Sequence, residues 1–108
     1  MSTQVAWLLL FLAGGLEIAW AIGIKYTDGF TKLMPSAFTI VTAGASFFLL
    51  AQAVRAIPVG TAYAIWGGIG AVGVAIIGIL AFHESMQWTR LLFLALIITG
   101  IVGLKMHG

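Results

Sequence analysis

The sequence predicts an all-α integral membrane protein, with four transmembrane helices in one domain that covers residues 1–108. Hydrophobic residues make up 62% of the chain and charged residues only 7%, so polar groups could not cover the surface of a water-soluble domain. The apolar residues fall into four stretches spread along the chain. Each stretch is close to the length of about 20 residues that a helix needs to cross the hydrocarbon core.

The predicted spans are separated by short connections that hold turn residues and charges. They cover residues 5–24, 34–53, 59–82 and 88–104. The first connection reads YTDGFTK, the second contains RAIP, and the third contains FHESMQWTR. Because the connections are short, consecutive spans are expected to run antiparallel. No basic residue precedes the first span and further spans follow it, so we expect it to be retained and not cleaved as a signal peptide.

The basic residues of the connections give almost no preferred orientation. With four spans both termini lie on one side of the membrane, together with Arg55 and Lys105. The other side carries Lys25, Lys32 and Arg90. The positive-inside rule therefore has little bias to act on, which predicts dual topology and makes an antiparallel homodimer reasonable. Four helices also enclose a solute path poorly, so a transport function would need a second copy.

Glu17 is the one charged residue between positions 5 and 24. A charge at the bilayer centre costs at least ~3 kcal/mol on insertion scales, and such residues mark functional sites. An apolar environment favours the protonated carboxyl group, so Glu17 is predicted to exchange a proton for a cation. The alternative is a glutamate that only forms a hydrogen bond to a neighbouring helix during assembly.

Two residues share the helix face of Glu17. Trp20 lies three residues after it and Gly14 three residues before it. Trp20 is predicted to form a wall of the binding site, where its N–H group could orient the carboxylate and its ring could attract a cation. The alternative for Trp20 is contact with lipid. Gly14 leaves space for a partner helix or a solute.

The third span adds an aromatic pair and a cluster of glycines. Tyr63 and Trp66 share a face and give a phenol and an indole to the predicted site. Gly67, Gly68 and Gly70 permit close packing, and Gly68 and Gly70 are predicted to let the helix bend. The alternative is a face used for packing alone.

Ser46 in the second span is the remaining polar candidate. Its hydroxyl group is expected to donate a hydrogen bond to the buried carboxylate or to its own helix. Asp28, His83 and Glu84 lie at the span edges and are expected to be solvated. The absence of cysteine excludes disulfides and thiolate metal sites. No metal, cofactor or nucleic-acid partner is expected, and an enzyme is disfavoured because the sequence holds no nucleophile–base pair or phosphate-binding loop.

Several segments carry a resemblance to a known family along nearly the full chain. They read AGGLEIAW, KYTDGFTKLMPS, ASFFLLAQA, IPVGTAYAIW and TGIVGLK. On these segments the chain resembles the small multidrug resistance family of four-helix membrane antiporters. The pair Glu17 and Trp20, with the loop IKYTDGF, is similar to the guanidinium exporter branch of that family.

The resemblance implies a multi-pass protein of the bacterial inner membrane that works as an antiparallel homodimer and exports guanidinium in exchange for protons. Glu17 would bind the protons or the cation, and Gly14 would make room beside it. The residues that would line and orient the site are Trp20, Ser46, Tyr63 and Trp66. Gly67 departs from the family pattern, which usually has Ser or Thr there. The missing hydroxyl group predicts that substituted guanidinium ions or other small organic cations are also carried.

Three other functions stay open on the sequence. The chain could be a broad-range exporter of quaternary ammonium ions from the same family. It could instead be an accessory subunit that stabilises a larger membrane complex without transporting anything, or a cation channel without saturable exchange.

Overall fold

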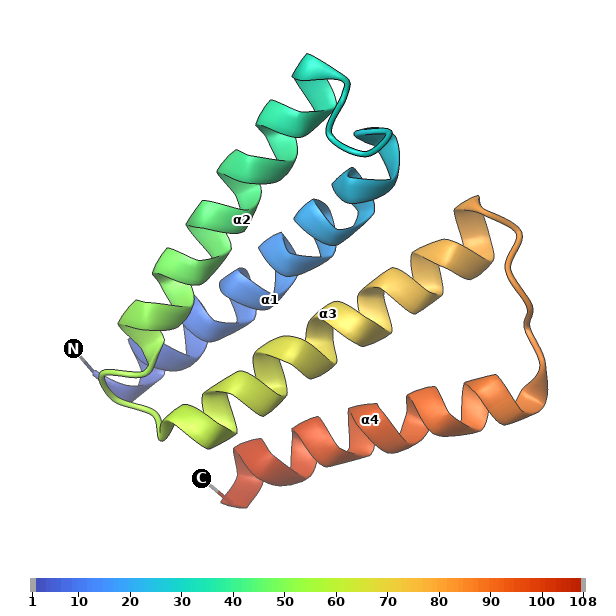
Figure 1. The fold of residues 1–108 in the computed structure, drawn as a ribbon. Coiled ribbons are helices and arrows are strands. Elements are labelled where there is room, and N and C mark those ends of the chain that lie inside the picture. The colour runs from blue at the N-terminus through green and yellow to red at the C-terminus, as the bar shows by residue number, and fades with distance from the viewer. Residues whose placement is uncertain (1, 108) are drawn as a thin grey trace.

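A computed structural model describes residues 2–107. These residues form four α-helices and no strand (Figure 1): α1 (Thr3–Tyr26), α2 (Leu33–Ala53), α3 (Val59–Ala81) and α4 (Trp88–His107). All four are long and apolar enough to cross a membrane. The predicted all-α membrane fold is confirmed for this part of the chain, and each helix begins and ends within three residues of a predicted span.

The turn between α1 and α2 is stabilised by the buried side chain of Thr27. Its hydroxyl group donates a hydrogen bond to the carbonyl of Ile24 at 2.7 Å and accepts one from the N–H of Phe30 at 3.2 Å. Asp28, Gly29 and Phe30 all have positive φ angles, which reverse the chain within a few residues. This local geometry places α2 antiparallel beside α1.

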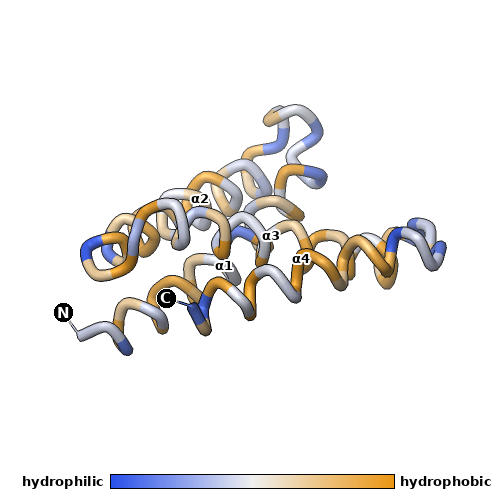
Figure 2. Tube along the Cα trace, turned by 90° about the horizontal axis from the view of Figure 1, so that it is seen from below, coloured by the Kyte–Doolittle hydropathy of each residue, from blue (hydrophilic) through white to orange (hydrophobic). Residues whose placement is uncertain are grey.

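Helix α1 lies at the centre of the arrangement, because it packs along α2 and also against α3. The backbone of α4 lies next to that of α3 alone among the described helices, and no residue of α4 is buried. The Cα atoms fill a flat slab of 39 × 36 × 16 Å, and Figure 2 shows hydrophilic residues gathered near the ends of the helices. One chain is therefore a thin layer with large apolar faces.

The apolar core lies at the end of the slab that holds both termini and the α2–α3 connection. It comes from the N-terminal halves of α1 and α3 and from residues 53–57, and its members are Ala6, Leu10, Ala13, Ala53, Ile57, Ala62, Ile65 and Trp66. Toward the opposite end α3 and α4 diverge, as do α2 and α3 (Figure 1). The site described next lies where the packed half gives way to this open half.

Candidate functional site

The carboxyl group of Glu17 lies directly against α3, in contact with Gly70. A Cβ atom built on Gly70 would overlap the carboxyl carbon and Oε2 of Glu17. Any larger residue at position 70 would therefore displace the carboxyl group. Gly70 thus has a role that the sequence did not predict: it makes the space in which the carboxyl group of Glu17 lies.

Other glycines allow α3 to approach its neighbours closely. A Cβ atom on Gly14 would lie 2.8 Å from Ile69, so the space beside Gly14 is filled by α3. A Cβ atom on Gly68 would lie 2.9 Å from Ile101 of α4. Helix α3 runs without interruption from Val59 to Ala81, so the bend at Gly68 and Gly70 stays a prediction.

Glu17 lines a pocket of about 390 Å³ between α1, α3 and the start of α4. The wall is made mostly of glycine, alanine and valine, and three charged side chains complete it: Glu17, Ala21, Gly67, Gly70, Ala71, Val74, Ala75, Glu84 and Arg90. Glu17 is half-buried, and its Oε2 atom has no hydrogen-bond partner among the described residues. An unpartnered carboxylate oxygen in a partly buried position is suited to binding a proton or a cation.

A second pocket, of about 490 Å³, lies between α1, α2 and α3. No charged residue is among the described residues that line it: Ile18, Ala19, Ile22, Gly23, Tyr26, Met34, Pro35, Phe38 and Ile77. Among its described lining residues, this pocket offers no carboxylate that would bind a proton or pair with a small cation. The smaller, charged pocket is therefore the candidate site.

Ser46 links three helices through its buried hydroxyl group. The hydroxyl donates a hydrogen bond to the carbonyl of Ala13 in α1 at 2.7 Å. It accepts a hydrogen bond from the indole N–H of Trp66 in α3 at 2.9 Å. Ser46 therefore bonds neither of the partners predicted for it, Glu17 or its own helix, because α1 lies close enough to offer a carbonyl.

The aromatic residues form a continuous cluster beside this network. Phe47 lies between Trp20 and Trp66, with ring centroids 6.2 Å and 5.3 Å away, and Tyr63 lies 5.4 Å from Trp66. Phe47 was not predicted as a site residue, because it stands in a run of apolar residues with nothing in the sequence to distinguish it from Phe48. The N–H group of Trp20 has no hydrogen-bond partner among the described residues, so the predicted bond to Glu17 is not formed here.

The predicted site residues thus fall into two neighbouring groups. Glu17 and Gly67 line the charged pocket. Tyr63 and Trp66 belong to the aromatic cluster, and Ser46 holds the cluster to α1. Trp20 lies one helical turn from Glu17 and touches the cluster through Phe47, so it connects the two groups.

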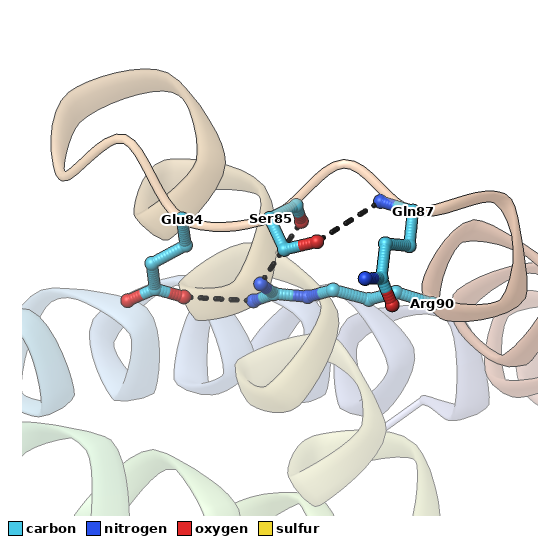
Figure 3. A network of polar contacts seen from close by, with 4 residues as sticks. All are labelled: Glu84, Ser85, Gln87 and Arg90. Carbon is cyan, nitrogen blue, oxygen red and sulfur yellow. Dashed lines mark hydrogen bonds and ion pairs between the residues drawn. The ribbon is translucent and has the colours of Figure 1, made fainter.

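Two charged residues of the pocket, Glu84 and Arg90, were not predicted as site residues. Glu84 was expected to be a solvated loop group, and it is exposed, but it also lines the pocket and forms an ion pair with Arg90 at 2.8 Å (Figure 3). A carboxylate and a guanidinium group six residues apart across a turn were the available signal. That spacing alone does not place either group in the pocket that Glu17 lines.

Comparison with known proteins identifies the family. The model of the Small Multidrug Resistance protein family matches residues 5–97. A guanidinium exporter of Yersinia pseudotuberculosis is 55% identical over 94% of this chain and 98% of its own length. Guanidinium exporters of Proteus vulgaris and Citrobacter freundii are each 56% identical over 94% of this chain, with 98% and 97% of their own lengths covered. With its four apolar helices, the chain is a multi-pass protein of the bacterial inner membrane and belongs to the small multidrug resistance family.

Proposed function

We propose that this protein exports guanidinium and small substituted guanidinium ions in exchange for protons, and that Glu17 binds both. The names of its relatives support the substrate class. The observation that carries the proposal is the position of the Glu17 carboxyl group, half-buried in a pocket with one oxygen unpartnered. The other two carboxylates of the chain, Asp28 and Glu84, lie in the connections between helices.

The chemistry of the pocket fits a small planar cation. Guanidinium presents its N–H donors in a fork that matches the two oxygens of a carboxylate. The glycine and alanine residues of the wall leave room beside Glu17. The aromatic cluster around Trp20 offers ring faces, which attract cations, one helical turn away.

The exchange follows from competition for the same oxygens. In an antiparallel homodimer, two Glu17 carboxyl groups would share the site and their titrations would be coupled. In this scheme, the site of the protonated dimer and that of the cation-bound dimer can each switch from one side of the membrane to the other. The empty dimer, with two charged carboxylates, cannot switch. Proton entry then drives cation export. The thin slab and the absence of any buried residue among the described residues of α4 support assembly with a second copy.

The test is transport by purified protein in liposomes. Transport is measured as electrical current and as the change in internal pH reported by a dye. Guanidinium is expected to drive saturable proton movement in the opposite direction. Glu17→Gln is expected to abolish this exchange while insertion and dimerisation persist, and Glu17→Asp to retain some transport with a shifted pH profile. Asp28→Asn, which removes a carboxylate outside the pocket, serves as the matched control.

Three results would contradict the proposal. Wild-type protein that moves no cation against a proton gradient would indicate an accessory subunit. Conductance that does not saturate would indicate a channel. Coupled transport by Glu17→Gln at the wild-type rate would show that the binding residue lies elsewhere.

A further inference from the structure

Glu84 and Arg90 meet at the edge of the pocket that holds Glu17. Nη2 of Arg90 lies 2.8 Å from Oε1 of Glu84. The Arg90 side chain is 31% exposed and the Glu84 side chain 48% exposed. His83, with a φ of 57°, reverses the chain after α3, and the N–H of Glu84 donates to the carbonyl of Gly78 at 3.1 Å. These features hold the Glu84 carboxylate against Gly78 in the last turns of α3. Figure 3 shows its ion pair with Arg90, and both residues line the pocket.

The ion pair engages the Glu84 carboxylate through one oxygen. The structure gives a single contact between the two groups, since the other terminal nitrogen of Arg90 donates to the carbonyl of Ser85 at 3.1 Å. A guanidinium group that saturates a carboxylate forms two parallel hydrogen bonds. The Arg90 side chain therefore leaves one oxygen of the partly solvated Glu84 carboxylate without a guanidinium partner. A free guanidinium ion has the donors to bond both oxygens.

Glu84 and Glu17 line the same pocket, and the wall between them is built of small residues. On α3 the Glu17 carboxyl group contacts Gly70 and the Glu84 carboxylate contacts Gly78, and the lining residues between them, Ala71, Val74 and Ala75, have no long side chain that would close the pocket. A carboxylate at the mouth of a pocket raises the local concentration of cations. Arg90 opposes this effect, because its positive charge lies at the same mouth and covers the same carboxylate.

We propose that Glu84 is a second cation-binding residue on the transport path. A guanidinium ion that enters from this end of the helices binds Glu84 in place of the Arg90 side chain and then passes to Glu17. Arg90 keeps the Ser85 carbonyl and solvent as partners while it is displaced. The inference rests on the proposed function, and it places one such entry residue at each membrane face of an antiparallel dimer.

The opposing structural role is a latch, in which the ion pair only ties α4 to α3. The two roles differ in the signs of their mutational effects. A latch is broken equally by losing either partner, so Glu84→Gln and Arg90→Met would change transport in the same direction. An entry site loses its ligand group in Glu84→Gln but loses a competitor in Arg90→Met, so the KM for guanidinium moves in opposite directions.

The experiment measures the KM for guanidinium in liposomes for the wild type, both single variants and the double variant. Glu84→Gln is expected to raise KM about tenfold, the loss typical of one charge-assisted hydrogen bond. Arg90→Met is expected to lower KM, and the double variant to behave as Glu84→Gln does. Size-exclusion profiles check assembly, and Arg90→Gln replaces Arg90→Met if the latter does not assemble.

Two matched controls separate binding from surface charge. Asp28→Asn and Lys32→Met remove the same charges at the same end of the helices, from residues that do not line the pocket. Both are expected to leave KM unchanged. The proposal is overturned if the single variants move KM in the same direction, or if Asp28→Asn raises KM as much as Glu84→Gln. A wild-type protein that carries no guanidinium would instead refute the proposed function itself.

Discussion

Gly70 of α3 lies so close to the carboxyl group of Glu17 in α1 that a methyl group on Gly70 would overlap it. The absence of a side chain at one residue therefore sets the position of the only carboxyl group within an apolar span.

Gly70→Ala is expected to displace the Glu17 carboxyl group and to lower guanidinium transport roughly 10- to 100-fold, because small misplacements of a binding group are costly. Overpacking should also destabilise the protein by about 1–3 kcal/mol. Gly60→Ala, on the same helix, is the control, because a Cβ atom at Gly60 would meet no atom within 4 Å. Transport rates of the two variants at equal protein content decide the matter. Equal rates would mean that Gly70 does not position Glu17.

Ser46→Ala is expected to destabilise the fold by about 1–3 kcal/mol, because it leaves the buried indole N–H of Trp66 without its acceptor. Thr42→Ala is the control, since the Thr42 hydroxyl bonds carbonyls of its own helix only. Equilibrium unfolding in mixed micelles measures both variants. A Ser46→Ala protein as stable as Thr42→Ala would show that the hydrogen bonds among α1, α2 and α3 contribute little.

Gly67→Thr is expected to narrow the substrate range while guanidinium is still carried. Gly67 lines the Glu17 pocket, and a Cβ atom there meets nothing within 4 Å, so threonine fits and fills space. Each tail methylene that a substituted guanidinium buries contributes at most ~0.8 kcal/mol to its binding free energy. Threonine at position 67 would occupy the space for the tail and remove this contribution. Currents across a series of alkylated guanidinium ions compare the variant with wild type. An unchanged range, or a wild type that carries guanidinium alone, would contradict this role for Gly67.

Wild-type protein is expected to insert in both orientations, because Arg55 and Lys105 on one side nearly balance Lys25, Lys32 and Arg90 on the other. Two lysines added beside Arg55 should shift the population toward one orientation. The chain has no cysteine, so single-cysteine variants can be labelled from each side without background. Labelling of the wild-type background from one side only would refute dual topology.

The sequence by itself determined the helices and singled out Glu17 as the one carboxylate within an apolar span. In lipid each helix satisfies its own backbone hydrogen bonds, so an apolar run of sufficient length specifies a span without reference to the rest of the chain. The cost of a carboxylate within such a run is equally local, and it singles out Glu17 before any contact is known.

The tertiary structure alone decided which groups meet. The four helices are apolar on nearly every side, so hydrophobic periodicity does not tell which face of each helix points inward. The rotation of α2 set the partners of Ser46 and brought Phe47 between Trp20 and Trp66. The close approach of α3 gave Gly70 its contact with Glu17, and the reversal at His83 carried Glu84 and Arg90 to the same pocket. Such contacts depend on the crossing and rotation of whole helices, which residues distant in the sequence determine together.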